Sequence, residues 1–151
     1  MITYMTENKD YLLELEYKTA FFSSDRIICF ITFKNNLGIT IASIKFPDYE
    51  LINLIDNIYA YIDISDNIMY TLKSYNDING IIYSIGLSTE YSFNSFKRYF
   101  TLYSYQDDIM IKILSFEITN TLDEFTDLLY EFFIESSDIL TDDTKKELMN
   151  L

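Results

Sequence analysis

Carboxylates are the side chains through which this sequence could do catalytic chemistry. The chain contains no histidine, which excludes Ser-His-Asp and Cys-His catalysis and every metal site that needs histidine. Its one cysteine, Cys29, excludes an intrachain disulfide and thiolate metal clusters, and the apolar run around it predicts a buried side chain. The three glycines are isolated and cannot form the glycine-rich pattern of a phosphate-binding loop.

Glu14 and Glu16 are the best-placed carboxylates, because they share one face of a predicted strand and lie about 7 Å apart. A pair at this spacing could supply a general acid and a general base. A catalytic acid, however, needs burial or a close partner that raises its pKa, and this pair is expected to be solvated. We therefore predict no catalytic residue and no enzymatic activity.

The segment Asp63-x-Ser65-x-Asn67 imitates the start of a calcium-binding loop. Ile68 stands where that loop has its glycine, and Ser74 stands where it has a bidentate glutamate. We reject the segment as a calcium site, and we expect neither a metal nor another cofactor.

Recognition of a partner is the chemistry that remains, and one helix is the main candidate. Apolar residues recur three and four positions apart from Leu122 to Phe133, which predicts a helix over 121–135 with one buried face. Thr121 and Glu124 form a T-x-x-E capping box, which is typical of a helix start. The residues predicted to be buried are Leu122, Phe125, Leu129 and Phe132.

The opposite face of this helix is acidic, and no lysine or arginine lies between Thr121 and Asp143. The polar turn Gln106-Asp107-Asp108, between two predicted strands, adds further acids. Acids beside tyrosines can bind a basic surface, because tyrosine gives a large contact area at a low entropic cost. We predict that the partner-binding residues are Asp107, Asp108, Asp123, Glu124, Asp127, Tyr130 and Glu131.

The net charge of −13, from 24 acids and 11 bases, bounds the class of partner. The excess is concentrated towards the C-terminus, since Asp107 to Leu151 contain 12 acids and 3 bases, a net charge of −9. Phosphate groups would be repelled, so we expect no direct binding to nucleic acid or to an anionic membrane. The pattern favours a basic protein partner, although an ordinary solvated acidic surface would have the same composition.

Apolar runs separated by turn residues predict a chain rich in strands. Tyr11–Lys18 alternates and predicts a strand with one solvated face, whereas Arg26–Lys34 is apolar on both faces and predicts a central strand covered on both sides. Ile2–Met5 is either a short strand or a frayed terminus, and Thr89–Ser95 is expected to be a polar loop. Further strands are predicted at Ile39–Phe46, Ile68–Tyr75, Ile81–Ser88, Tyr99–Tyr105 and Ile109–Thr119.

These elements predict an α+β fold for residues 1–151 as a single domain. Short turns imply antiparallel pairing, so we expect one large, mainly antiparallel twisted sheet with two packed helices. The first helix is predicted over about 48–62, with Asp48 as its N-cap, and the second over about 121–135. Residues 136–151 are expected to form an acidic C-terminal tail that can fray. The buried stripe of the first helix is predicted to be Leu51, Leu54, Ile55, Ile58 and Ile62.

Two further patterns bear on location. Met1–Asp10 is polar and lacks the basic start and apolar run that are typical of a signal peptide. No apolar segment approaches the roughly 20 residues needed to cross a bilayer. We therefore expect a cytoplasmic protein, and the sequence leaves its oligomeric state open.

Several short features follow one another as they do in a known group of proteins. They are Leu13-Glu14-Leu15 in an early strand, the turn Asn36-Leu37-Gly38, the helix start Asp48-x-Glu50-Leu51, and Ile118-Thr119 ahead of Leu122-x-x-Phe125. In this order of elements, from Tyr11 to Phe133, the chain resembles the small immunity proteins of bacterial polymorphic toxin systems, particularly the group that includes the immunity protein of the wall-associated toxin. The resemblance implies a non-enzymatic inhibitor that binds and silences one toxin, often a nuclease with a basic active-site face.

The predicted function is therefore that of an acidic binding protein, an immunity protein or antitoxin that neutralises a toxin domain by direct binding. Two other classes stay open. One is a phage or plasmid inhibitor whose carboxylates mimic the charge of nucleic acid against a host DNA-binding enzyme. The other is a structural or adaptor subunit that hides its aromatic surface in a homo-oligomer.

Overall fold

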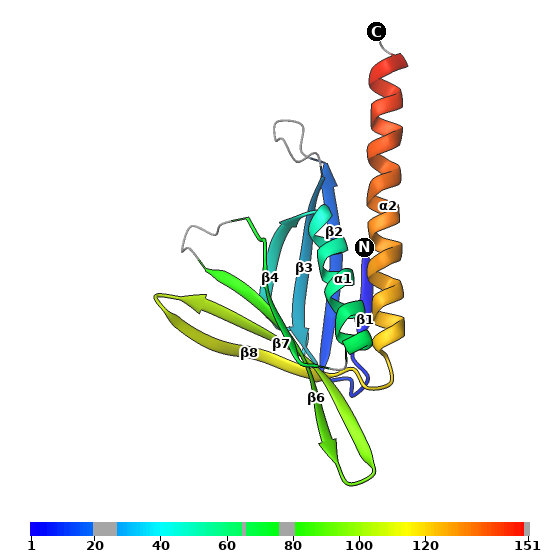
Figure 1. The fold of residues 1–151 in the computed structure, drawn as a ribbon. Coiled ribbons are helices and arrows are strands. Elements are labelled where there is room, and N and C mark those ends of the chain that lie inside the picture. Colours follow the sequence, from blue (N-terminus) through cyan, green and yellow to red (C-terminus); the bar gives the residue numbers. More distant parts are fainter. Residues whose placement is uncertain (20–26, 65, 76–80, 150–151) are drawn as a thin grey trace.

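The chain runs through four strands and a helix, and then repeats that order (Figure 1). This computed structural model describes residues 1–19, 27–64, 66–75 and 81–149, and the side chains of the last helix as far as Asp138. The first half contains β1 (Ile2–Met5), β2 (Tyr11–Thr19), β3 (Ile27–Asn35), β4 (Thr40–Pro47) and α1 (Tyr49–Ile64). The second half contains β5 (Ile68–Leu72), β6 (Ile82–Ser92), β7 (Ser95–Gln106), β8 (Ile109–Glu117) and α2 (Leu122–Met149).

The eight strands form two four-stranded sheets, each with its strands in chain order. Sheet A has the order β1-β2-β3-β4, sheet B has the order β5-β6-β7-β8, and every neighbouring pair is antiparallel. The predicted α+β class with mainly antiparallel strands and two packed helices is confirmed. The strands are divided between two sheets, whereas the sequence predicts one large sheet.

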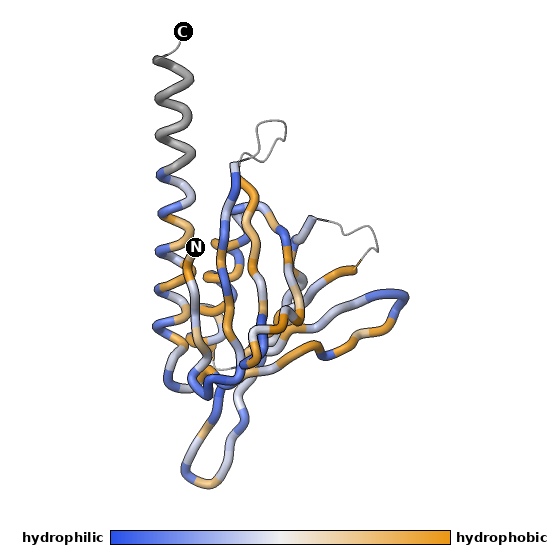
Figure 2. The backbone as a smooth tube through the Cα atoms, turned by 180° about the vertical axis from the view of Figure 1, so that it is seen from behind, coloured by the Kyte–Doolittle hydropathy of each residue, from blue (hydrophilic) through white to orange (hydrophobic). Residues whose placement is uncertain are grey.

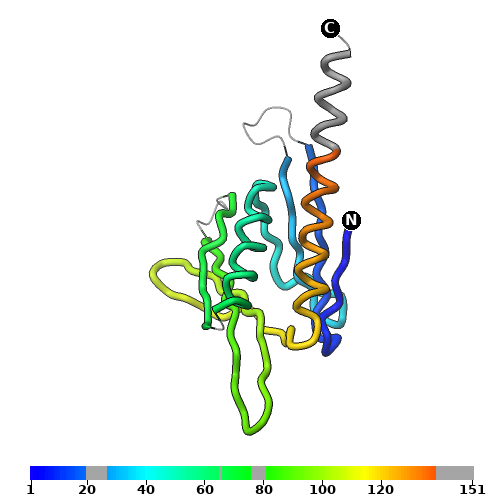
Figure 3. The backbone as a smooth tube through the Cα atoms, turned by 45° about the vertical axis from the view of Figure 1, so that its right-hand side comes forward, coloured from blue at the N-terminus to red at the C-terminus, as the bar shows by residue number. Residues whose placement is uncertain are grey.

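Both helices pack on the same face of sheet A (Figures 1 and 3). Burial alternates strictly along β3, where Cys29, Ile31 and Phe33 are buried while Ile28 and Phe30 stay partly exposed. The prediction that this central strand is covered on both sides is therefore wrong. Its outer apolar residues are shielded by long neighbours instead, since the Lys18 ammonium lies 5.4 Å from the centre of the Phe30 ring.

The two sheets and the helices share one hydrophobic core, and Phe100 of β7 lies at their junction. Its ring centre is 6.2 Å from that of Phe33 in sheet A, 4.9 Å from that of Phe116 in β8, and 5.7 Å from that of Phe125 in α2. Aromatic rings at these separations gain from edge and offset contacts in addition to burial. One residue thus ties both sheets to α2.

The helix α1 begins close to its predicted start, because Pro47 ends β4 and the Leu51 amide donates to the Asp48 carbonyl at 3.1 Å. Four of its five predicted core residues, from Leu51 to Ile58, are buried. Ile62 is only partly buried, and Tyr61 takes its place in the core.

Two segments differ from the prediction in length. The helix α2 continues to Met149, beyond the predicted end at residue 135 and through most of the expected tail. Thr89–Ser95, predicted to be a loop, lies almost entirely in strands, because β6 and β7 continue as a long hairpin up to a turn at Phe93 and Asn94.

Candidate functional site

The predicted helical site residues lie on the solvent side of α2. Asp123, Glu124, Asp127 and Glu131 are all exposed, and the Tyr130 side chain is 55 % exposed. The opposite side is buried as the apolar periodicity predicts, at Leu122, Phe125, Leu129 and Phe132. Figure 2 shows the same alternation, with hydrophilic residues recurring between apolar ones along this helix. The site therefore contains one continuous acidic helix face.

The start of α2 is fixed by β1 and by the turn that follows it. The Tyr4 hydroxyl lies 2.7 Å from the Thr121 hydroxyl, and the Glu7 carboxylate accepts from the Asn120 backbone amide at 2.9 Å. The Thr121 side chain thus contacts Tyr4 at the predicted cap position, and the Thr121 carbonyl accepts the first helical hydrogen bond from Phe125. Burial raises the pKa of Tyr4, the Thr121 hydrogen bond partly opposes this, and the nearby Glu124 charge adds to it.

Asp107 and Asp108 form the two-residue turn between β7 and β8. Their φ angles of 54° and 62° are those of a type I′ turn, which aspartate tolerates better than most residues other than glycine. The Asp108 carboxylate accepts from the Tyr105 hydroxyl at 3.0 Å. Both residues are exposed, as predicted. This hairpin projects from the side of the molecule away from α2 (Figures 1 and 2). The structure therefore does not bring the seven predicted residues together, and the two aspartates are separate from the α2 face.

The exposed stripe of α1 is a neighbouring feature that the sequence analysis missed. Ile52 and Tyr59 are 40 % and 52 % exposed, and they alternate with the exposed acids Asp56 and Asp63. The helix α1 packs against α2, so both helices present their solvent sides next to each other above sheet A (Figure 3). The spacing of these four residues is the signal that could have revealed the stripe, because they recur four, three and four positions apart.

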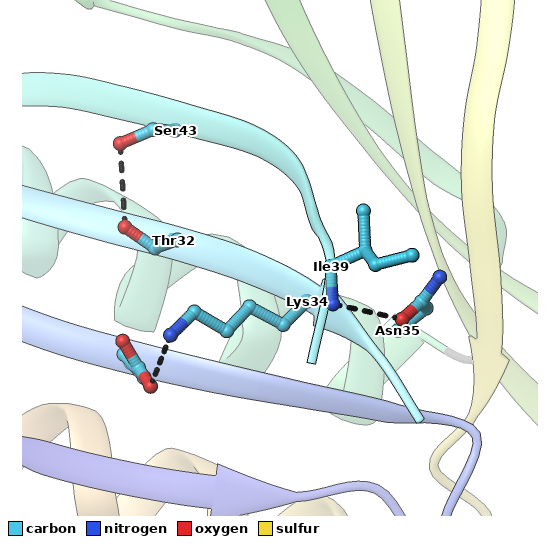
Figure 4. Close-up of polar contacts among 6 residues, drawn as sticks. Thr32, Lys34, Asn35, Ile39 and Ser43 are labelled. Carbon is cyan, nitrogen blue, oxygen red and sulfur yellow. Dashed lines mark hydrogen bonds and ion pairs between the residues drawn. The ribbon is translucent and has the colours of Figure 1, made fainter. Parts of the chain in front are cut away.

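The strand carboxylates Glu14 and Glu16 share the outer face of sheet A, as predicted. The Lys34 ammonium donates to the Glu14 carboxylate at 2.9 Å (Figure 4). Glu16 is exposed and lies opposite Phe30 on the neighbouring strand. Within the described parts of the chain this is the only ion pair. Glu14 is therefore paired with a base and not with a second acid. A general acid is usually kept protonated by burial or by a nearby carboxylate, and this environment supplies neither.

Among the side chains that the structure describes, one carboxylate is buried, and it belongs to α1. Glu50 is 1 % exposed; its two oxygens accept from the Asn53 side-chain amide at 3.0 Å and from the Lys73 backbone amide at 3.2 Å. The hydroxyl of Tyr70 is buried nearby and has no hydrogen-bond partner among the described residues. Burial raises the pKa of Tyr70 far above its usual value, and the Glu50 charge adds to this. Glu50 therefore fastens α1 to the segment that follows β5.

The cysteine has the environment that its neighbours in the sequence predict. Cys29 is fully buried, and burial raises the pKa of its thiol to about 12. The thiolate is the reactive form of cysteine, so this side chain acts as a small apolar residue at neutral pH.

The described residues contain neither a metal-binding cluster nor a membrane-spanning helix. No group of three or more cysteine, aspartate or glutamate side chains is arranged to hold a metal ion in the part of the chain that the structure describes. In the same residues, no helix is long and apolar enough to cross a membrane. In the segment rejected as a calcium site, the Asn67 side-chain oxygen accepts from the Thr89 backbone amide at 3.0 Å. Ser65 of that segment lies outside the described residues.

Comparison with known proteins gives little help with function. No protein-family model matches this chain, and no curated protein matches it. The solved structure of the plant transcriptional regulator PBF-2 covers 98 % of this chain and 87 % of its own, with a TM-score of 0.49 and 11 % sequence identity. A likeness this distant carries no argument about what the present chain binds.

Proposed function

We propose that this protein binds a basic protein partner through the solvent side of α2, and that the partner is a bacterial toxin which the binding silences. The observation that carries the proposal is the continuous acidic helix face with the half-exposed Tyr130 at its centre. Acids alone would describe a solvated surface, but a large exposed aromatic residue among them is typical of an interface anchor.

The proposed mechanism has two steps. The acids from Asp123 to Glu131 steer a basic partner to the helix, because opposite charges accelerate diffusional encounter. Apolar side chains then slow dissociation as they lose contact with water. Tyr130 and Ile134, 55 % and 43 % exposed, lie within this face, and Tyr59 lies on the adjacent helix.

The resemblance of the sequence to immunity proteins, in the order of its predicted elements, supports a toxin as the partner. In this proposal the protein acts in the cytoplasm and has no catalytic activity of its own. Inhibition would come from occupation of a basic surface of the toxin, which a rigid acidic helix can contact without chemistry.

The test begins with the partner. The protein is purified together with its partner from the native host, the partner is identified by mass spectrometry, and surface plasmon resonance measures association at two ionic strengths. Replacing Asp123, Asp127 and Glu131 with lysine should slow association by about tenfold or more at low salt. The defect should shrink as salt rises, because dissolved ions screen exposed charges.

A matched control separates local from net charge. Lysine at Glu16, Asp66 and Glu90 changes the net charge equally on exposed residues outside the two helices, and it should slow association far less. Tyr130→Ala should mainly speed dissociation. If the α2 lysine variant is folded and associates like the parent at both ionic strengths, α2 is only a solvated face. Asp107→Asn with Asp108→Asn should have little effect, since that hairpin lies away from α2.

A further inference from the structure

The hairpin formed by the ends of β6 and β7 extends beyond the rest of sheet B (Figure 1). β5 pairs with β6 only as far as Leu87, and β8 pairs with β7 only from Tyr99 onwards. Past these points the two strands pair with each other as far as Ser92 and Ser95, and with no other described strand. The turn carries Phe93, which at 96 % exposure is the most exposed large hydrophobic residue among those that the structure describes.

The two faces of this hairpin differ in chemistry. Successive strand residues point to opposite faces, so the face that buries Leu87 and Phe100 continues outwards through Tyr91, Phe96 and Arg98. Tyr91 and Phe96 are directly opposite each other and are 73 % and 46 % exposed. The other face carries the opposed charges of Glu90 and Lys97. One face is therefore aromatic with a single cation, and the other is balanced in charge.

A hollow of about 190 Å³ lies on the aromatic face, lined by Tyr61, Thr89, Tyr91, Phe96 and Arg98. Its floor is rigid, because the buried Tyr61 hydroxyl donates to the Ser88 carbonyl at 3.0 Å and also contacts the Thr89 hydroxyl. The Arg98 guanidinium lies over the Phe96 ring, 5.2 Å from its centre. It makes no ion pair with any residue that the structure describes. Stacking on an aromatic ring holds the planar cation in place while leaving its N–H donors available.

The size and charge of this hollow decide what it can bind. Pockets for free small molecules are usually about 300–1,000 Å³, so this one fits a single side-chain head group. A guanidinium takes a carboxylate in a bidentate geometry. This face does not suit a nucleic-acid strand, because the backbone of such a strand needs several basic side chains in a row. Here Lys97 and Arg98 point to opposite faces, and the chain carries a net charge of −13.

We propose that the aromatic face of the β6–β7 hairpin is a second protein-binding surface, which takes an aspartate or glutamate side chain of a partner segment into the hollow at Arg98. Tyr91, Phe93 and Phe96 contact apolar residues next to that acid. Tyrosine, phenylalanine and arginine are the residues enriched at the centres of protein interfaces. The partner segment is acidic and apolar, which is the reverse of the basic partner proposed for α2, so the two surfaces can be tested separately.

The experiment pans a random peptide library displayed on phage against the immobilised full-length protein and measures the selected peptides by fluorescence polarisation. We expect one class of selected peptides to contain an acid beside an aromatic or aliphatic residue. Arg98→Gln should weaken their binding by about tenfold or more, which is the usual effect of losing a hydrogen-bonded charge pair. Lys97→Gln is the matched control, since it removes the same charge from the next residue on the opposite face, and it should weaken binding less than about twofold.

The backbone bonds of Arg98 with Thr119 and Ile118 do not depend on its side chain, so the Arg98→Gln variant keeps the strand pairing; thermal melts verify the fold. Basic peptides bound at α2 should be indifferent to Arg98→Gln. The proposal is overturned if no acidic class is selected, or if the acidic peptides bind Arg98→Gln and Lys97→Gln equally well. It is also overturned if a labelled oligothymidylate binds in an Arg98-dependent manner and the acidic peptides do not.

Discussion

The two helices occupy the same place in the two halves of the chain, each after four antiparallel strands, but they meet solvent differently. The exposed side of α1 mixes Ile52 and Tyr59 with two acids, whereas the exposed side of α2 is dominated by acids around Tyr130. Their buried sides are alike, since each places an apolar stripe in the common core. The fold therefore constrains only the buried sides, and the solvent sides are free to differ in the partner chemistry they offer.

A glutamate in the first turn of each helix shows the same contrast. Glu50 in α1 is buried and accepts a hydrogen bond from the Lys73 backbone, beyond β5. Glu124 in α2 is exposed, and its charge contributes to raising the pKa of Tyr4. The same residue type near the positive end of each helix is structural in one case and available to solvent in the other. A count of acids therefore overstates the acidic surface that a partner can reach.

The largest expected effects test whether the buried sides are equivalent. Phe125 in α2 and Ile58 in α1 are 1 % and 0 % exposed, so Phe125→Ala should cost about 3–5 kcal/mol and Ile58→Ala about 2–5 kcal/mol. Tyr130→Ala should change the free energy of unfolding by less than about 0.5 kcal/mol. Urea unfolding measures all three. A loss below about 1 kcal/mol for Phe125→Ala would mean that α2 is not docked on the sheets as described.

The two first-turn glutamates, Glu50 in α1 and Glu124 in α2, offer a sharper test of the same contrast. Glu50→Ala should cost about 2–3 kcal/mol, because the Lys73 amide and the Asn53 side chain lose their buried acceptor. Glu50→Gln keeps one acceptor oxygen, which can still accept from the Lys73 amide, and should cost less. Glu124→Ala should cost less than about 1 kcal/mol, which is the usual range for an exposed acid at a helix start. Equal losses at Glu50 and Glu124 would contradict the assignment of a structural role to Glu50 alone.

Local periodicity explains why much of the fold could be predicted. The three-and-four spacing from Leu122 to Phe132 determines which side of α2 is buried, and hence which acids are exposed, without reference to the rest of the chain. The turn at Asp107 and Asp108 was likewise predictable, because short acidic side chains tolerate positive φ. These predictions depend on residues that are close in sequence.

The misses depend on residues that are far apart in sequence. The distance between the Asp107–Asp108 turn and α2 depends on how sheet B is oriented, which no local pattern specifies. The extension of β6 and β7 has no buried alternation to reveal it, because cross-strand pairs such as Tyr91 and Phe96 hold it together in solvent. The burial of Glu50 was hidden for the same reason, since its partner Lys73 lies 23 residues later in the sequence, beyond β5.

Removing the hydroxyl of Tyr70, the tyrosine near Glu50, should have a small effect on the free energy of unfolding, and it tests how dry the buried side of α1 is. Tyr70 has a buried hydroxyl with no partner among the described residues, and such a group costs about 1–3 kcal/mol relative to a satisfied one. Tyr70→Phe removes the hydroxyl and should therefore stabilise the fold by about 1 kcal/mol at neutral pH. The matched change at the exposed Tyr130 should leave the free energy of unfolding within about 0.5 kcal/mol.

The pH dependence of the same variant follows from the raised pKa of Tyr70, because the folded state favours the neutral phenol. The contribution of Tyr70 to the free energy of unfolding is fully present below the pKa of an unfolded tyrosine, about 10. This contribution is lost as the pH rises above that value towards the folded pKa. Tyr70→Phe has no proton to lose, so its advantage over the parent should grow in urea melts performed about one unit above the unfolded tyrosine pKa. An advantage that stays constant with pH would show that the Tyr70 hydroxyl reaches solvent in the folded protein. The buried side of α1 would then be less dry around Glu50 than its 1 % exposure indicates.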